Sequence, residues 1–183
     1  IEKYFKNFSK NGKEFQQIIF KKKCSINILN TGKKSMTGGR LKRVSKYIRS
    51  NENFMFTYGD GLSNVNLSKL EKFHLKNKRI VTVTAVRPPA RFGELTINKK
   101  TVTKFLEKPQ VSKGWINGGF FVANKKIFKF IKNDTTILEK EPLERLAKKK
   151  SLIAFKHYGF WRCMDTKRDK DFLEKLSKSK NIE

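Results

Sequence analysis

The sequence predicts an α/β fold with a mixed, mainly parallel central sheet flanked by helices. Strand-like and helix-like segments alternate along the 183 residues, which is the order found in sheets covered by helices. Residues 54–58 form a continuous apolar and aromatic run, and residues 80–86 are rich in β-branched residues. Both patterns are typical of strands buried on two sides. No repeat or low-complexity linker interrupts the chain, so we expect a single domain over residues 1–183.

The first half of the chain predicts three helices and two short strands besides the run 54–58. Apolar residues at helical spacing indicate helices over 1–8, after 35–39, and over 67–74. Short strands are expected at 15–20 and 24–29, and turn residues end the second one. One face of the second helix would carry Leu41, Val44, Tyr47 and Ile48. The buried stripe of the third helix would consist of Leu67, Leu70 and Phe73.

The second half begins where Pro88 and Pro89 break the chain. Residues 92–97 and 101–107 predict a strand pair around 98–100, which makes the sheet mixed. A further strand is expected over 115–122, with Gly118 and Gly119 inside it. The remaining patterns predict helices over 125–131, 141–149 and 166–177, and a strand over 152–157.

Net charge is the most pronounced global property, with 43 basic and 16 acidic residues giving +27. Clustered basic residues would indicate nucleic-acid binding, because they neutralise phosphates. Here only nine of the 43 are arginine and the lysines spread over the whole chain. This pattern favours a solvated surface that concentrates small phosphorylated molecules, and nucleic-acid binding stays a remote alternative.

Several other classes are disfavoured by the composition. No apolar run is long enough to cross a bilayer, and no signal peptide is visible at the first residues. The two cysteines and two histidines lie too far apart in sequence for a zinc site of closely spaced ligands. We therefore expect free thiols in a reducing cytoplasm.

Two carboxylates lie at the ends of predicted elements. Asp60 lies between Gly59 and Gly61 directly after the run 54–58, where ligands bind in open α/β sheets. A tight turn would explain the same pattern. Asp165 precedes the last helix, and its position alone favours a helix N-cap. Together the two acids are the ligands that a magnesium ion needs beside phosphates and water.

Three further stretches hold candidate binding residues. Gly38 and Gly39 open a helix, where free N–H groups and Arg40 would suit an anion. Lys108 lies at the end of a strand before a proline, although it is also one more surface lysine. Asn117 lies in an apolar strand before two glycines, which indicates either a polar group in a pocket or a bulge.

These stretches occur together and in a fixed order, and the combination resembles the glucose-1-phosphate cytidylyltransferases within the sugar-phosphate nucleotidyltransferase family. The resemblance runs from about residue 30 to near the end of the chain. Its strongest blocks are residues 36–43, 56–61, 88–93, 107–109, 116–121, 141–143 and 159–166. It implies a Rossmann-like nucleotidyltransferase fold, also called the nucleotide-diphospho-sugar transferase fold.

The resemblance also implies roles for single residues. Asp60 and Asp165 correspond to the carboxylates that hold Mg²⁺, and Lys108 to the lysine that grips the sugar phosphate. Positions that contact substrate or face the sugar are Ser35, Arg40, Gly59, Glu107, Asn117 and Gly118. On this basis Asp165 would be a metal ligand, whether or not it also caps the helix.

The implied reaction joins CTP and glucose 1-phosphate to give CDP-glucose and pyrophosphate, for surface polysaccharide such as O-antigen in lipopolysaccharide. The resemblance implies a cytoplasmic homo-oligomer that uses neither nucleic acid nor membrane as partner. A related enzyme using UTP or dTTP, or an inactive fragment, are the alternatives.

The chain departs from the family pattern at several positions. Asn30 stands where relatives have Asp, Ala90 where they have Gly, and Arg162-Cys163 where they have Gln-Pro. We expect Arg162 to add positive charge near the metal carboxylate. The family begins with a strand and a glycine-rich loop that bind the nucleotide, and we expect this chain to lack that segment together with the first strands of its sheet.

Overall fold

The computed structural model describes residues 14–19, 22–48, 53–88, 94–106 and 114–179. Its contacts group into two compact units, one of residues 1–49 with 128–144 and one of residues 50–127 with 145–183. Each unit is described by itself. The helix predicted over 1–8 lies outside the described residues.

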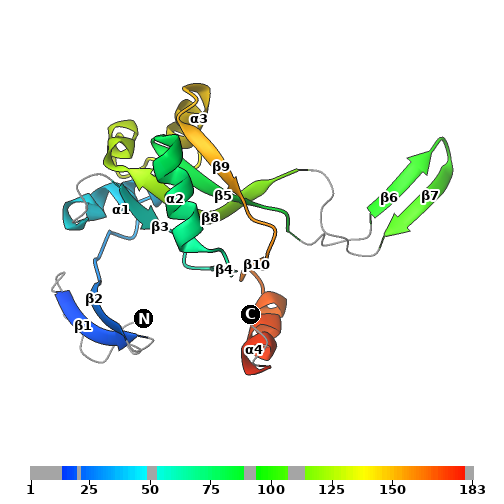
Figure 1. Cartoon of the computed structure of the whole chain (residues 1–183), viewed down its shortest axis with the longest axis horizontal. Coiled ribbons are helices and arrows are strands. Elements are labelled where there is room, and N and C mark those ends of the chain that lie inside the picture. The colour runs from blue at the N-terminus through cyan, green and yellow to red at the C-terminus, as the bar shows by residue number, and fades with distance from the viewer. Residues whose placement is uncertain (1–13, 20–21, 49–52, 89–93, 107–113, 180–183) are drawn as a thin grey trace. The chain divides into compact units, whose positions relative to one another are not determined.

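The first unit begins with a hairpin and a short helix (Figure 1). Strands β1 (Glu14–Ile19) and β2 (Lys22–Asn27) pair antiparallel, with Glu14 opposite Asn27. Gly32, with φ of +83°, makes the following turn, and its N–H donates to the side chain of Asn30. Helix α1 (Thr37–Val44) continues into a 3₁₀ turn, η1 (Ser45–Tyr47). Both predicted strands and this helix are confirmed.

The start of α1 is packed against backbone rather than open to a ligand. The N–H groups of Gly38 and Gly39 donate to the carbonyl of Thr136 at 3.0 and 3.3 Å, and both glycines are buried. A Cβ at Gly39 would lie 2.3 Å from the carbonyl oxygen of Asp134. The prediction of an anion site on these two N–H groups is therefore wrong, because the Thr136 carbonyl in a neighbouring loop already accepts from them.

The second unit contains a four-stranded sheet in the order β3 (Asn53–Phe56), β8 (Ile116–Asn124), β5 (Val81–Val86) and β9 (Leu152–Lys156). β8 runs antiparallel to both β3 and β5, whereas β5 and β9 run parallel. The α/β class and the mixed sheet are confirmed. A mainly parallel sheet is not what the described strands form, because β8 returns between two of them in the opposite direction.

Burial was predicted for two strands of this sheet, β5 and β3. β5 is central and almost wholly buried, as predicted. β3 was predicted to be buried on both sides, which is wrong for the described residues, since β3 pairs only with β8 and Met55 is 40% exposed. An apolar run therefore does not by itself distinguish a central strand from this one.

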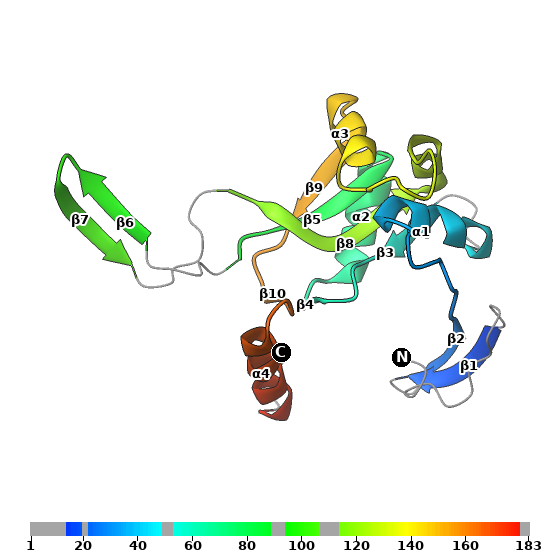
Figure 2. The same ribbon diagram turned by 180° about the vertical axis from the view of Figure 1, so that it is seen from behind.

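Helix α2 (Leu67–Asn77) covers one face of the sheet in both views (Figures 1 and 2). The Asn66 side chain caps it by accepting from the N–H of Lys69. The buried stripe is Leu70 and His74, with Phe73 edge-on against Phe155 of β9. Leu67 was expected in this stripe but is 47% exposed; it is the first residue of the helix.

Most of the remaining elements agree closely with the predicted ranges, but the short strands β4 and β10 were not predicted. β6 (Glu94–Asn98) and β7 (Thr101–Leu106) form the expected antiparallel hairpin. Elsewhere the chain forms β4 (Gly61–Ser63), η2 (Lys125–Phe130), α3 (Glu141–Lys148), β10 (Trp161–Cys163) and α4 (Lys167–Lys178). Within the described ranges, no helix has the length and apolar character needed to span a bilayer.

Candidate active site

A short two-stranded ladder brings the two predicted metal carboxylates together. The chain leaves β3, passes Gly59 and Asp60, and enters β4, which pairs antiparallel with β10. In this register Gly61 lies opposite Cys163, and the ladder is extended by a bond from Met164 N–H to the Asp60 carbonyl at 2.9 Å. Asp60 and Asp165 therefore lie at the same end of the ladder, although 105 positions separate them in sequence.

The side chains of Asp60, Cys163 and Asp165 converge on one point. Each offers one donor atom, and the three atoms all lie within 4.8 Å of one another. Both carboxylates are exposed, and the thiol is half-buried. Two hard carboxylate oxygens beside open solvent are the donor set of a divalent cation that keeps water or phosphate ligands, so the residues present fit such an ion.

The surroundings of the Cys163 thiol raise its pKa. Its Sγ donates to Asp165 Oδ1 at 3.1 Å. Burial, the hydrogen bond to Asp165 and the charges of Asp60, Asp165 and Asp169 raise the pKa of Cys163 to about 11. Ionisation of the thiol beside these carboxylates is therefore disfavoured unless a cation arrives with it.

An aromatic group fixes the end of β3 beside this cluster. Phe56 stacks on Phe121 of β8 with ring centroids 4.5 Å apart, and Tyr58 meets Phe121 edge-on at 5.8 Å. The Asn117 side chain donates to the Tyr58 hydroxyl at 3.1 Å and accepts from the N–H of Gly119 at 2.9 Å. Asn117 is thus held through Tyr58, next to Gly59 in sequence.

Gly118 and Gly119 allow this close approach of β8. Gly119 has φ of +84°, and a Cβ there would lie 2.7 Å from the Tyr58 ring. The β5–β8 register shifts between Val83 and Ala85, so the bulge that was one of the two alternatives for this stretch is present. The Gly118 carbonyl accepts from Trp161 Nε1 at 2.8 Å, which ties β8 to the ladder that carries the acids.

Asp165 is not the helix N-cap that its position alone favours. Thr166 is the cap of α4 and forms a capping box with Asp169. A hydrogen bond from the Thr166 hydroxyl and, as the next largest cause, one from the Arg162 side chain lower the pKa of Asp169 below its usual value. Because the cap is one residue later, the Asp165 carboxylate is left to face Cys163.

Arg162 does not bring free positive charge to the acids as we expected. Its guanidinium pairs with Asp169 at 3.0 Å and lies over the Phe172 ring at 4.5 Å. The arginine therefore anchors the start of α4 to β10, and Asp169 balances its charge.

The other predicted residues have separate places. Arg40 donates to the Thr31 hydroxyl at 2.8 Å in the first unit, and Ser35 there is 6% exposed. Both belong to the first unit, and Asp60, Asn117 and Asp165 to the second. Glu107 and Lys108 lie outside the described residues.

Cys163 and Trp161 are the site residues that our reading of the sequence missed. We treated Cys163 as a free thiol and as a departure from the family pattern, although it lies two residues before Asp165 on an extended segment. Residues two apart on such a segment share a face, and that spacing was the available signal.

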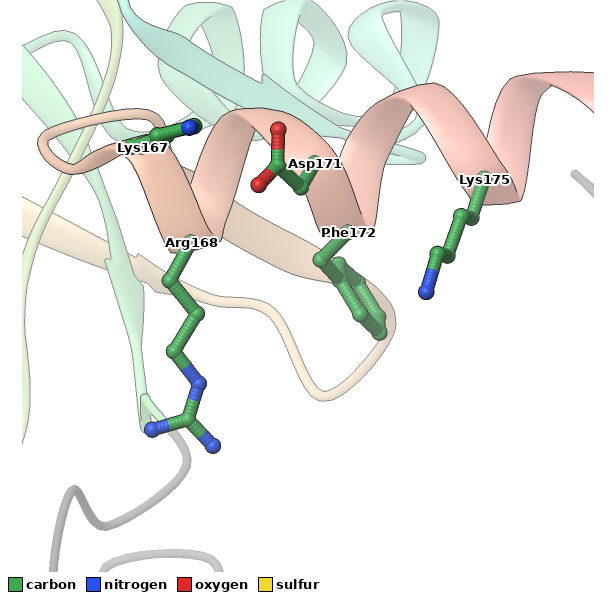
Figure 3. A pocket seen from close by; sticks show the side chains of 5 residues that line it. All are labelled: Lys167, Arg168, Asp171, Phe172 and Lys175. Carbon is green, nitrogen blue, oxygen red and sulfur yellow. The ribbon is translucent and has the colours of Figure 1, made fainter.

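A hollow beside α4 is a weaker candidate. Its lining consists of Lys167, Arg168, Asp171, Phe172 and Lys175 (Figure 3). All five come from one helix, and Figure 3 shows Arg168 and Lys175 extending away from it. With no facing element among the described residues, the hollow has no second wall to fix a ligand, so the acidic cluster is the better site.

Comparison with solved structures identifies the class of fold. The structure is similar to the crystal structure of an apo-UDP-glucose pyrophosphorylase, with a TM-score of 0.60 and 15% identity over 84% of this chain and 64% of that one. At this identity the match shows the fold alone. The chain therefore has the same class of fold as that pyrophosphorylase.

The chain belongs to the nucleotidyl transferase family, which matches residues 2–178. It is 47% identical over 152 residues to the glucose-1-phosphate cytidylyltransferases of Salmonella typhimurium and Salmonella typhi. The match covers 83% of this chain and 59% of each relative, so the chain spans about three fifths of the length of the curated relatives it matches.

Proposed function

We propose that the protein transfers a cytidylyl group from CTP to glucose 1-phosphate, giving CDP-glucose and pyrophosphate, in nucleotide-sugar synthesis for surface polysaccharide. The observation that carries this proposal is the convergence of Asp60 and Asp165 within 4.8 Å. It occurs in a chain 47% identical to glucose-1-phosphate cytidylyltransferases. Both reactants are anions, and a paired carboxylate site is a means of bringing them together through a cation.

The chemistry needs positioning rather than an acid or a base. A phosphate oxygen of glucose 1-phosphate attacks the α-phosphorus of CTP, the bond from that phosphorus to the bridging oxygen breaks, and pyrophosphate leaves. The nucleophile is already ionised, so no proton is removed. A bound Mg²⁺ would supply charge neutralisation for the phosphates, held by Asp60 and Asp165.

The other roles follow the family resemblance. Lys108 would hold the attacking phosphate, and Glu107 and Asn117 would face the sugar. Ser35, Arg40, Gly59 and Gly118 would contact substrate. For Asn117 the structure supports the proposal, because its bonds to Tyr58 and Gly119 fix the amide beside the acidic ladder.

Three statements about the whole protein belong to the same proposal: a single nucleotidyltransferase domain, a homo-oligomeric state and a cytoplasmic location. The free thiol of Cys163 supports the last, because reducing compartments keep thiols unpaired.

A nucleotide panel tests the proposed reaction. The purified protein would be incubated with glucose 1-phosphate, Mg²⁺ and, in separate reactions, CTP, UTP, dTTP or GTP. We expect pyrophosphate release and CDP-glucose formation to be fastest with CTP, and the variant Asp60→Asn to lose roughly 100-fold in turnover while keeping its fold.

Each other outcome has a defined meaning. A preference for UTP or dTTP would replace the nucleotide but keep the reaction class. Turnover of Asp60→Asn at the wild-type rate would contradict the metal role. No product with any nucleotide would reject the proposal for this polypeptide, and a gel-shift titration at physiological salt would then test the nucleic-acid alternative.

A further inference from the structure

We infer that the Cys163 thiol is a third ligand for the cation at Asp60 and Asp165, so that this site binds thiophilic divalent cations such as Zn²⁺ and Cd²⁺ more tightly than Mg²⁺. The inference rests on the proposed cation site at the two carboxylates. It adds a ligand and a metal preference to that site.

The geometry places the sulfur within reach of an ion shared with both acids. The three donor atoms lie within 4.8 Å of one another. Ligand distances of roughly 2.3 Å for sulfur and roughly 2.1 Å for carboxylate oxygen put two ligands of a tetrahedral Zn²⁺ about 3.6 Å apart. Small rotations of exposed side chains close the remaining difference.

The thiol already faces the ion's position. Cys163 Sγ donates its proton to Asp165 Oδ1 at 3.1 Å, so sulfur and carboxylate point to the same place. The cross-strand neighbour of Cys163 is Gly61, which has no side chain to fill the space above it. When a cation binds, the S–H bond breaks, a sulfur–metal bond forms, and the proton passes to solvent.

The donor set then determines the preference. Carboxylate oxygens suit Mg²⁺, whereas a thiolate suits Zn²⁺ and other soft cations. A site with two oxygens and one sulfur accepts both kinds but favours the softer ion. Zn²⁺ would accordingly compete with Mg²⁺ at these two carboxylates.

Cadmium binding gives a direct test, because a sulfur–cadmium bond produces an ultraviolet charge-transfer band. The purified protein would be titrated with Cd²⁺ alone, and with Cd²⁺ in the presence of excess Mg²⁺. Parallel titrations would use Cys163→Ser, Cys163→Ala and the matched control Cys24→Ser. Circular dichroism would verify that every variant is folded.

We expect a band in the wild-type protein and in Cys24→Ser but not in either Cys163 variant. We also expect Cd²⁺ affinity to fall at least about tenfold in Cys163→Ser, and excess Mg²⁺ to diminish the wild-type band because both ions use the same carboxylates. Loss of the Cys163 variants by misfolding would leave the Mg²⁺ competition in the wild-type protein to decide.

Three outcomes would overturn the inference: no band, a band that persists without Cys163, or a band that saturating Mg²⁺ leaves unchanged. Failure here is distinguishable from failure of the proposed function. If the charge-transfer band is absent but Asp60→Asn still loses CDP-glucose formation, only the thiol ligand is wrong.

Discussion

At the scale of single residues, Gly39 and Gly59 differ in what surrounds them. A Cβ at Gly39 would lie 2.3 Å from the Asp134 carbonyl oxygen, whereas a Cβ at Gly59 would meet no atom of the described residues within 4 Å. One glycine is therefore required by packing. The other lies in open space next to Asp60, where we propose that substrate approaches.

We predict that Gly39→Ala lowers the free energy of unfolding by about 1–3 kcal/mol through overpacking. Gly59→Ala should leave it nearly unchanged but raise KM for the sugar phosphate or nucleotide, because the added methyl group projects toward the ligand. Urea denaturation and steady-state kinetics measure the two effects. A destabilised Gly59→Ala, or one with wild-type KM, would contradict the assignment.

Part of the cluster of Asp60, Cys163 and Asp165 could be predicted from the sequence. Asp60 could be selected because it follows a strand-like run, whereas Asp165 was selected only through the family resemblance, and the structure brings the two together. The cap of α4 could not be assigned to Thr166 in place of Asp165, since both residue types cap helices well. Only the hydrogen bond from Asp169 N–H to the Thr166 hydroxyl decides between them.

At the scale of elements, α2 is joined to the sheet by a buried histidine. His74 is 2% exposed, and its ring nitrogens lie 2.8 Å from the Thr82 hydroxyl on β5 and 3.3 Å from the Asn53 amide oxygen on β3. Both partners are neutral. Burial therefore lowers the pKa of His74 below its ordinary value of 6.5.

This lowered pKa predicts a loss of stability in acid. Above about pH 6.5 His74 is neutral in both the folded and the unfolded chain. As the pH falls below that value the unfolded chain takes up a proton that the folded chain resists, so stability decreases until the folded pKa is passed. We expect a steeper acid loss in the wild-type protein than in His74→Gln.

Urea denaturation at about pH 8 and about pH 5.5 would measure the difference, which is at most about 1.4 kcal/mol for each pH unit between the two pKa values. Equal pH dependence in the two proteins would show that His74 does not titrate with unfolding.

Element types were largely predictable, whereas pairings were not. Periodicity located β5, α2 and the β6–β7 hairpin, because burial of one face or two dictates the pattern of apolar residues. It did not reveal that β8 lies between β3 and β5, since strand order depends on contacts distant in sequence. The short β4–β10 ladder was also missed, because three residues are too few to show a pattern.

At the scale of the whole molecule, the positive charge and the acidic cluster have different effects. A net charge of +27 attracts phosphorylated molecules from a distance. The negative carboxylates bind those molecules only through a cation. On this account the long-range field raises encounter rates, and the local site provides selectivity for metal-bound phosphates.

The central claim is that Asp60 and Asp165 hold one divalent ion, and Mn²⁺ binding measured by electron paramagnetic resonance tests it most directly. The proteins would be wild type, Asp60→Asn, Asp165→Asn and the control Asp171→Asn on the exposed side of α4. We predict one site in the wild type and the control, weakened at least about tenfold by either ligand change. Wild-type affinity in Asp60→Asn or Asp165→Asn would contradict the shared site.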